Sequence, residues 1–178
     1  MKFCSQCGGK LAYRVPEGDS LQRHLCDDCG VIHYVNPKLV IGALPEWNRK
    51  ILLCRRAIDP RKGYWTLPAG FMELGETTEQ AAIRETLEEA NARIELNELY
   101  TMLSVPHFGQ VHLFYRARLL DLDFSAGPES LDVELFDEAD IPWEDIAFRT
   151  VSTTLRHFLA DRGAGNFRFR SGEIGPQG

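Results

Sequence analysis

The stretch of residues 70–91, GFMELGETTEQAAIRETLEEAN, constrains this chain more than any other part of its sequence. If a helix begins near Thr78, a rotation of about 100° per residue places Glu85, Glu88 and Glu89 within roughly a third of its circumference. Like charges at these spacings repel each other by about 0.2 to 0.5 kcal/mol per pair. We therefore expect the three carboxylates to face a divalent metal ion. The alternative is a solvated acidic face on an amphipathic helix.

The same helix has sequence signals at both ends. Thr77, followed three residues later by Gln80, is typical of a capping box at a helix N-terminus. Asn91 tolerates the left-handed backbone conformation and so provides a stop. The apolar residues expected opposite the carboxylates are Ile83, Leu87 and Ala90.

Glycines bracket the loop just before the helix, which can fold back over the helix entrance. Gly70, Glu76, Arg84-Glu85 and Glu88-Glu89 together resemble the Nudix box of the Nudix hydrolases. The two departures from that motif are Thr86, where an aliphatic residue is usual, and Asn91, where glycine is usual. The resemblance implies an α/β fold, an α/β/α sandwich of the Nudix type. It also implies hydrolysis of the diphosphate bond in a nucleoside diphosphate joined to another group.

Mg²⁺ suits such a site because it prefers oxygen ligands and usually keeps several waters. We expect Mg²⁺, or Mn²⁺, to be held by Glu85, Glu88 and Glu89, with the carbonyl of Gly70 as a further ligand. A regulator that only senses nucleotides is a rival interpretation. Such a protein would usually have lost some of the box carboxylates, whereas all four are kept here, as Glu76, Glu85, Glu88 and Glu89.

Two further charged groups complete the predicted site. Arg84 is expected to orient the carboxylates by pairing with Glu76 or Glu88. The resemblance implies an additional glutamate in a later loop, as metal ligand or general base, with Glu129 as the first candidate and Glu134 as the second. The general base stays open among Glu88, Glu89 and Glu129.

The N-terminal part of the chain predicts a zinc ribbon. Two Cys-x-x-Cys pairs, separated by eighteen residues, are made by Cys4, Cys7, Cys26 and Cys29. Four thiolates in this spacing suit a tetrahedral structural Zn²⁺, and two disulfides are the alternative. Because four cysteines complete the site, His24 and His33 are expected to be surface or substrate-side residues. Cys54 is expected to be a buried thiol without a chemical role.

The chain divides into a ribbon at residues 1–36, a Nudix domain at 37–162 and an irregular tail at 163–178. Within the Nudix domain we expect a hairpin, two longer strands and a packing helix. Their ranges are 39–44 and 50–55 for the hairpin, 92–105 and 111–120 for the strands, and 150–161 for the helix.

The substrate is expected to be a small dinucleotide. Arg55 could attract phosphate, while Phe108 and Gln110 lie in a loop where an aromatic ring could stack on a base or an isoalloxazine. Several runs make the chain similar, along nearly its whole length, to the FAD pyrophosphatases of plant plastids; they include residues 65–70 and 127–131. This resemblance implies cleavage of FAD to FMN and AMP, with ADP-ribose or NADH as alternatives. The chain lacks the Ser-Gln-Pro-Trp-Pro-Phe-Pro-like run of the bacterial NADH pyrophosphatases.

The net charge of −6 argues against a general nucleic-acid binder and against an anionic membrane surface. Residues 1–36 carry four basic and four acidic side chains, so a nucleic-acid-binding ribbon is not favoured either. No apolar run reaches the roughly 18 residues of a membrane span, and the first cysteine pair follows Met1 at once. We expect a cytoplasmic protein. Many family members are dimers, and the sequence leaves a homodimer open.

Overall fold

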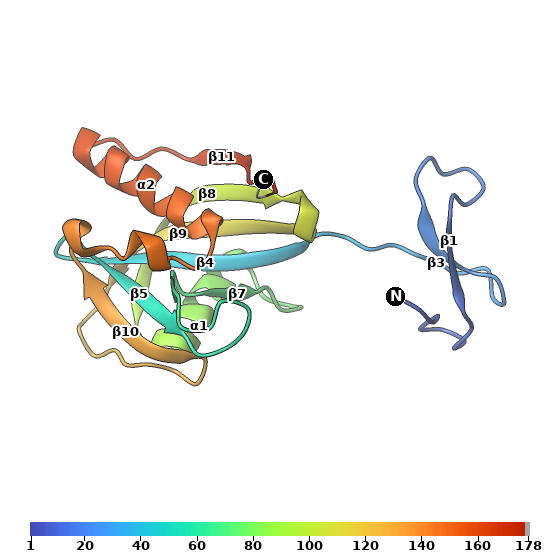
Figure 1. Ribbon diagram of the computed structural model, residues 1–178, viewed down its shortest axis with the longest axis horizontal. Helices are drawn as coiled ribbons and strands as arrows, with labels where there is room; N and C mark the ends of the chain where they lie inside the picture. The colour runs from blue at the N-terminus through green and yellow to red at the C-terminus, as the bar shows by residue number, and fades with distance from the viewer. Residues whose placement is uncertain (177–178) are drawn as a thin grey trace. The chain divides into compact units, whose positions relative to one another are not determined.

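The computed structural model describes residues 1–176, which separate into two compact units (Figure 1). The first unit is Met1–Pro37 and the second begins at Lys38. None of the described helices is long and apolar enough to cross a bilayer.

The first unit is a small three-stranded antiparallel sheet with little apolar interior. Its strands are β1 (Leu11–Arg14), β2 (Arg23–Cys26) and β3 (Ile32–His33), in that spatial order. Phe3 and Tyr13 are 59% and 61% exposed, whereas Cys4 and Cys26 are buried. Since cysteines rather than large apolar side chains occupy its interior, a bound metal would supply much of the stability of this unit.

The second unit is a mixed sheet with one helix on each face. Its strands are β4 (Lys38–Trp47), β5 (Lys50–Arg56), β6 (Trp65–Thr66), β7 (Ala69–Phe71), β8 (Ile94–Val105), β9 (Gln110–Leu119), β10 (Ser130–Phe136) and β11 (Arg170–Glu173). The helices are α1 (Thr78–Ala90) and α2 (Arg149–Ala164), with short 3₁₀ turns at Pro106–Phe108, Glu138–Asp140 and Trp143–Asp145. The main strand order is β10-β5-β4-β9-β8-β11, while β6 pairs with β5 and β7 pairs with β4.

Successive side chains along a strand point to opposite faces of the sheet, so the core has one part against α1 and another against α2. Ile41 and Tyr115 cluster with Ala81 and Ala82 of α1, whereas Phe114 clusters with residues of α2. Figure 1 shows α1 and α2 on opposite sides of the sheet. The predicted α/β/α sandwich is confirmed.

The predicted hairpin of β4 and β5 forms, with Asn48 and Arg49 at positive φ in its turn. The two strands pair only next to the turn, and farther from the turn β4 pairs with β7 instead. Strand β9 pairs with β4 in parallel from Lys38 to Glu46. Gly42 permits the close approach of β7, because a Cβ there would lie 2.5 Å from the Ala69 Cβ. The separation of β4 from β5 therefore makes room for β7, which carries Gly70.

Helix α1 begins and ends as predicted. Both hydrogen bonds of the capping box between Thr77 and Gln80 are present, and Asn91 adopts φ 47° with its amide donating to Leu87 O. The expected apolar face is right for Ala90, which is buried, but wrong for Ile83 and Leu87, which are 43% and 49% exposed. The helix instead turns its alanines toward the sheet, since their small side chains allow close packing.

The C-terminal segment differs from the expected irregular tail. Helix α2 continues to Ala164, and β11 pairs in parallel with β8. Asp161 receives hydrogen bonds from Arg170 and from the buried Tyr100 hydroxyl at 2.8 Å, which fastens this segment to the sheet. The tertiary contacts thus order a strand whose sequence has no apolar alternation.

Candidate active site

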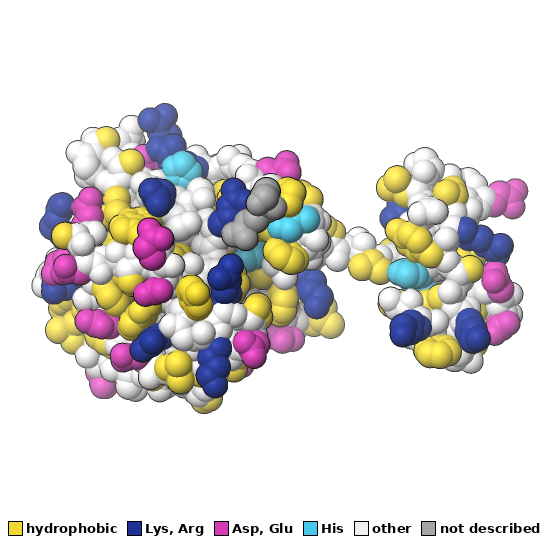
Figure 2. All heavy atoms as spheres, in the orientation of Figure 1, with side chains coloured by type: hydrophobic (Ala, Val, Ile, Leu, Met, Phe, Trp, Pro, Cys, Tyr) yellow, Lys and Arg dark blue, Asp and Glu magenta, His cyan; other side chains and the backbone are white. Residues whose placement is uncertain are grey.

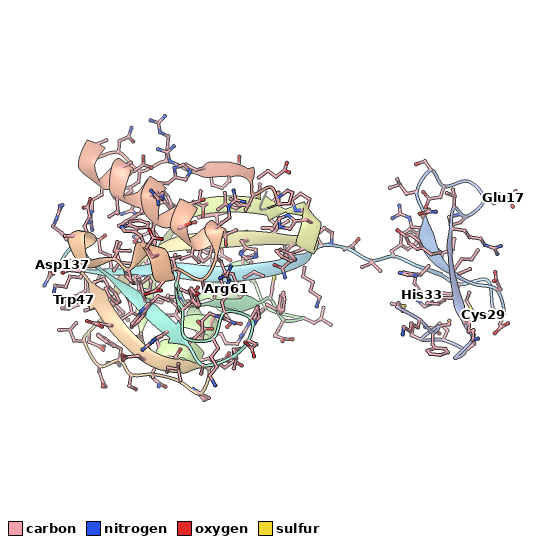
Figure 3. All side chains as sticks on the ribbon, in the orientation of Figure 1. Glu17, Cys29, His33, Trp47, Arg61 and Asp137 are labelled. Carbon is pink, nitrogen blue, oxygen red and sulfur yellow. The ribbon has the colours of Figure 1, made fainter. Side chains whose placement is uncertain are left out.

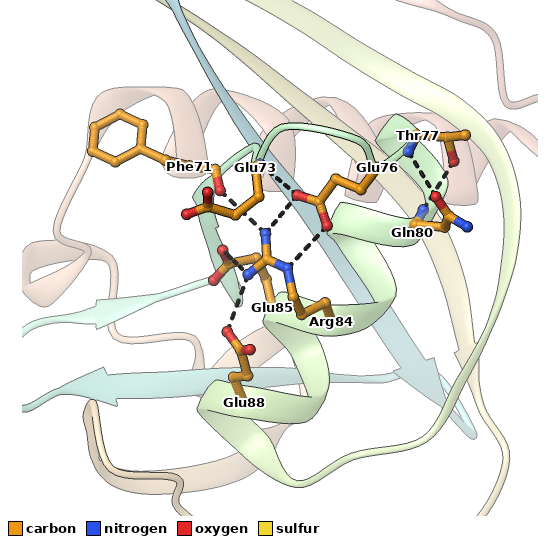
Figure 4. A network of polar contacts seen from close by, with 8 residues as sticks. All are labelled: Phe71, Glu73, Glu76, Thr77, Gln80, Arg84, Glu85 and Glu88. Carbon is orange, nitrogen blue, oxygen red and sulfur yellow. Dashed lines mark hydrogen bonds and ion pairs between the residues drawn. The ribbon is translucent and has the colours of Figure 1, made fainter.

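Arg84 lies at the centre of the box and holds three glutamates (Figure 4). Its Nε and Nη2 donate to the two oxygens of Glu76 at 3.0 and 2.7 Å. Its Nη1 donates to Glu85 at 2.6 Å and to Glu88 at 3.0 Å, and Nη2 also reaches the Phe71 carbonyl at 3.1 Å. The bidentate contact with Arg84 lowers the pKa of Glu76 to about 2. Arg84 therefore connects the glycine loop to the carboxylate face of α1.

The carboxylates of the helix differ in exposure. Glu85 and Glu89 are 8% and 6% exposed, whereas the Glu88 side chain is 58% exposed. Burial raises the pKa of Glu85, and it raises the pKa of Glu89 to about 8 even though the Ala69 amide donates to it at 3.1 Å. Buried carboxylates with raised pKa values are stabilised in their ionised form by a nearby cation. Oxygen donors of this kind fit a hard divalent ion.

Glycines bring two backbone segments against this carboxylate face. A Cβ at Gly70 would lie 2.3 Å from Glu85 Oε2, so only glycine leaves the carboxylate where it is. A Cβ at Gly127 would lie 1.7 Å from the Glu88 carbonyl oxygen, and the Gly127 amide donates to Glu89 O at 3.0 Å. The loop before β10 is thereby packed against the end of α1.

That loop places Glu129 on the wall of the cavity that contains the box glutamates. The negative charge of Glu129 contributes to the raised pKa values of both Glu85 and Glu89. Glu134, the second candidate, is exposed on β10 and is not among the lining residues of this cavity. The sequence prediction used Gly127 only as part of the run 127–131 and did not assign it to the site, although its place two residues before Glu129 is a detectable turn signal.

The box opens into a cavity of about 1460 Å³ with aromatic walls. The box residues that line it are Gly70, Arg84, Glu85, Glu88 and Glu89. The aromatic side chains are Tyr64, Phe71, Phe108, Phe114, Trp143 and Phe148. Phe108, which is 72% exposed, and Gln110 both lie on the wall, and their role in substrate binding stays a prediction.

The two neighbouring arginines at the end of β5 have different surroundings. Arg55 is exposed, donates from Nε to Gly63 O at 2.9 Å and does not line the cavity, so its expected place is wrong. Arg56 lines the cavity and is only 9% exposed. Its Nε donates to Pro60 O at 2.9 Å, and its guanidinium lies 5.1 Å from the Phe148 ring centroid. No carboxylate within residues 1–176 forms an ion pair with it. Arg61, labelled in Figure 3, lines the cavity as well.

The four cysteines of the first unit form a compact sulfur cluster. The described cysteines are all free, and the four Sγ atoms lie within 4.8 Å of one another. Cys4 and Cys29 are 3.7 Å apart and Cys7 and Cys26 are 3.4 Å apart, near the roughly 3.8 Å expected between sulfurs around a tetrahedral Zn²⁺. The donor set therefore fits zinc, and the disulfide alternative does not match these separations.

His33 has a different place from the one expected. Its Nε2 lies 3.2 Å from Cys4 Sγ, so it contacts the sulfur cluster directly instead of lying free on the surface. Figure 3 shows His33 and Cys29 in the same small unit. Its pairing with His24 across β2 and β3 positions it there, which the sequence alone did not reveal.

Comparisons with known proteins identify both units. The Nudix N-terminal zinc-ribbon model matches residues 2–35, and the NUDIX domain model matches residues 37–160. ADP-ribose pyrophosphatase of Methanocaldococcus jannaschii is 33% identical over 113 residues, covering 61% of this chain and 67% of that protein. NAD-capped RNA hydrolase NudC of Edwardsiella ictaluri is 33% identical over 141 residues, which are 78% of this chain but only 50% of NudC.

Solved structures agree with these matches. A NUDIX hydrolase from Nitrosomonas europaea has a TM-score of 0.96 and 56% identity, covering 99% of this chain and 100% of that chain. An ADP-ribose pyrophosphatase from Streptococcus suis shares the fold, with a TM-score of 0.62 and 22% identity over 78% of this chain and 100% of that chain. The chain belongs to the Nudix hydrolase family, as a NUDIX domain preceded by a zinc ribbon.

Proposed function

We propose that this protein hydrolyses the diphosphate bond of a nucleoside diphosphate joined to another group, with FAD, cleaved to FMN and AMP, as the preferred substrate. The observation that carries the reaction class is the buried pair Glu85 and Glu89 at one wall of a large cavity. Glu85 packs against Gly70 and is held by Arg84, whereas Glu89 accepts a hydrogen bond from the Ala69 amide. The name of the M. jannaschii relative, an ADP-ribose pyrophosphatase, supports the same class.

A divalent ion, Mg²⁺ in our proposal, would be held by Glu85, Glu88, Glu89 and the Gly70 carbonyl. When bound, the ion supplies positive charge that stabilises the negative charge of the reacting diphosphate. Arg84 keeps Glu85 and Glu88 in fixed positions, because its planar guanidinium donates to both from one nitrogen. The proton of the attacking water goes to a carboxylate at this wall, and Glu88, Glu89 and Glu129 all remain candidates for that base.

Arg56 is suited to bind a phosphate of the substrate. Arg56 is 9% exposed and its guanidinium forms no ion pair within residues 1–176, although it is close enough for its charge to act on the Glu89 carboxylate. A bound anion would therefore offset the cost of burying it. Its Nη atoms form no hydrogen bond within the described residues, so they are available to phosphate oxygens. Its position, lining the cavity that also contains the box, supports a diphosphate substrate spanning the two.

The preference for FAD rests on two features. The cavity volume of about 1460 Å³ and its aromatic walls suit a substrate with two large planar rings. The sequence runs at 65–70 and 127–131 are similar to those of plant plastid FAD pyrophosphatases. ADP-ribose and NADH are the alternatives, and the name of the M. jannaschii relative favours testing ADP-ribose. Basic and acidic side chains are interspersed on the visible surface (Figure 2). That the protein has no nucleic-acid partner stays a prediction.

The test is a panel of FAD, ADP-ribose, NADH and diadenosine polyphosphates, assayed with Mg²⁺ for release of AMP. We expect FAD to have the highest kcat/KM. Glu88→Gln and Glu89→Gln should each lower kcat by about a hundredfold or more, because each removes a negatively charged ligand. Glu134→Gln is the matched control, since Glu134 lies outside the cavity. If both box variants kept near-normal turnover, the metal-site proposal would be wrong. If FAD ranked far below the other compounds, the proposed substrate would be wrong but the proposed reaction class would stand.

A further inference from the structure

A chain of three hydrogen-bonding side chains lines the cavity that contains the box. Gln110 and His112 lie on β9, and Thr150 lies at the start of α2. The His112 ring joins the other two, with Nε2 3.0 Å from Gln110 Oε1 and Nδ1 3.0 Å from Thr150 Oγ1. Gln110 and His112 are half-buried and Thr150 is buried.

The direction of these hydrogen bonds follows from the donor capacity of each atom. Gln110 Oε1 can only accept, so His112 Nε2 must donate to it. Burial lowers the pKa of His112 to about 4, and the imidazole is therefore neutral near neutrality. A neutral ring with a proton on Nε2 accepts at Nδ1, and the Thr150 hydroxyl must then donate.

This order of donors leaves the amide nitrogen of Gln110 free. Within residues 1–176 no group accepts a hydrogen bond from Gln110 Nε2, and Gln110 lines the same cavity as Phe108. An amide with two available donors in a cavity that also contains an exposed aromatic ring matches a planar heterocycle that carries a ring nitrogen or carbonyl acceptor. Such a heterocycle is present in the substrates of the proposed function, on which this inference rests.

We propose that the Gln110 carboxamide donates a hydrogen bond to an acceptor on a heterocyclic ring of the substrate, and that His112 and Thr150 are positioning residues that fix its orientation. Without the imidazole, the carboxamide could rotate and present its oxygen. The ring of an adenine or of an isoalloxazine offers the required acceptor, and the two can be distinguished with the separate products.

The test combines kinetics with FAD and ADP-ribose and calorimetric binding of AMP and of FMN. Gln110→Leu and Gln110→Glu, both without donors, should raise KM about fivefold to tenfold while kcat stays within about twofold. His112→Leu should do the same, and the double variant Gln110→Leu/His112→Leu should be no worse than Gln110→Leu alone, since His112 acts through Gln110. His112→Gln keeps a neutral donor and Thr150→Ser keeps the hydroxyl, so each of these variants should retain most of the wild-type affinity for substrate. His157→Leu is the control, since His157 lies outside the cavity.

The calorimetric measurements with AMP and with FMN identify which ring Gln110 contacts. Weaker binding of AMP alone would assign Gln110 to the adenine, and weaker binding of FMN alone to the isoalloxazine. Either result supports the proposal, even if wild-type turnover of dinucleotides were absent and the proposed function failed. Unchanged binding of both products by the Gln110 variants, or effects of the Gln110 and His112 changes that multiply in the double variant, would overturn it.

Discussion

Gly70→Ala should remove activity without unfolding the protein. A Cβ at this position would lie 2.3 Å from Glu85 Oε2 and 2.4 Å from both Cδ and Oε1, whereas ordinary contact begins at 3.4 Å. The carboxylate must therefore move by 3.4 minus 2.3, or 1.1 Å. Because the clash is with the end of a flexible side chain, the cost in folding free energy is small. The shift falls on a group proposed to bind metal, and Arg84, which holds Glu85 at 2.6 Å, resists it.

A displacement of about 1 Å at a reacting centre can cost about a hundredfold in rate, so we expect kcat for Gly70→Ala to fall by about that factor. The assay is AMP release at saturating Mg²⁺, with thermal unfolding measured on the same samples. Gly163→Ala is the matched control, because a Cβ there meets nothing within 4 Å and the residue lies inside α2. That control should keep full activity and gain about 0.5 to 1 kcal/mol of stability. Activity of Gly70→Ala within about threefold of wild type would refute the reasoning.

Three other outcomes are expected. Arg84→Lys keeps the charge but loses the planar fork that holds Glu76 and two further glutamates, so kcat should fall about tenfold with little change in melting temperature. Hydrogen bonding with Arg170 lowers the pKa of Asp161 to about 2, below its ordinary 3.8; the associated stability is present above pH 3.8 and is lost as the pH falls toward about 2. Urea unfolding across this range should show a shallower acid dependence for Asp161→Asn, and an unchanged slope would contradict the assignment. Chelation of zinc should make residues 1–35 protease-sensitive while Mg²⁺-dependent hydrolysis partly survives, and unaltered digestion would argue against a structural zinc.

The features that the sequence predicted are local ones. The capping box, the stop at Asn91 and the convergence of Glu85 and Glu89 all follow from spacing within one helix, where geometry depends on nearby residues. The cluster of four cysteines could also be predicted from the sequence, because a structural zinc ion requires a similar spacing of its ligands in different proteins.

The features that the sequence missed depend on tertiary placement. Arg55 and Arg56 are adjacent in the sequence, and only the pairing of β5 with β6 and β10 decides which of them enters the cavity. The exposure of Ile83 follows from how α1 rotates onto the sheet, which its alanines determine. Strand β11 could not be predicted from Arg-Ser-Gly-Glu, because its order comes from the contact between Arg170 and Asp161.

Strand β11 also determines where the molecule can be shortened or extended. It covers the part of the outer edge of β8 from Thr101 to Ser104, whose free amides and carbonyls would otherwise be available to other chains. Just after β11, Ile174 and Gly175 line the cavity, and Arg149 donates to the Gly175 carbonyl at 2.7 Å. Truncation after Ala164 would therefore produce two defects together, self-association through the bare edge and a substrate cavity lacking part of its wall. Engineering of this enzyme is safer at the hairpin tip around Asn48, which does not line the cavity.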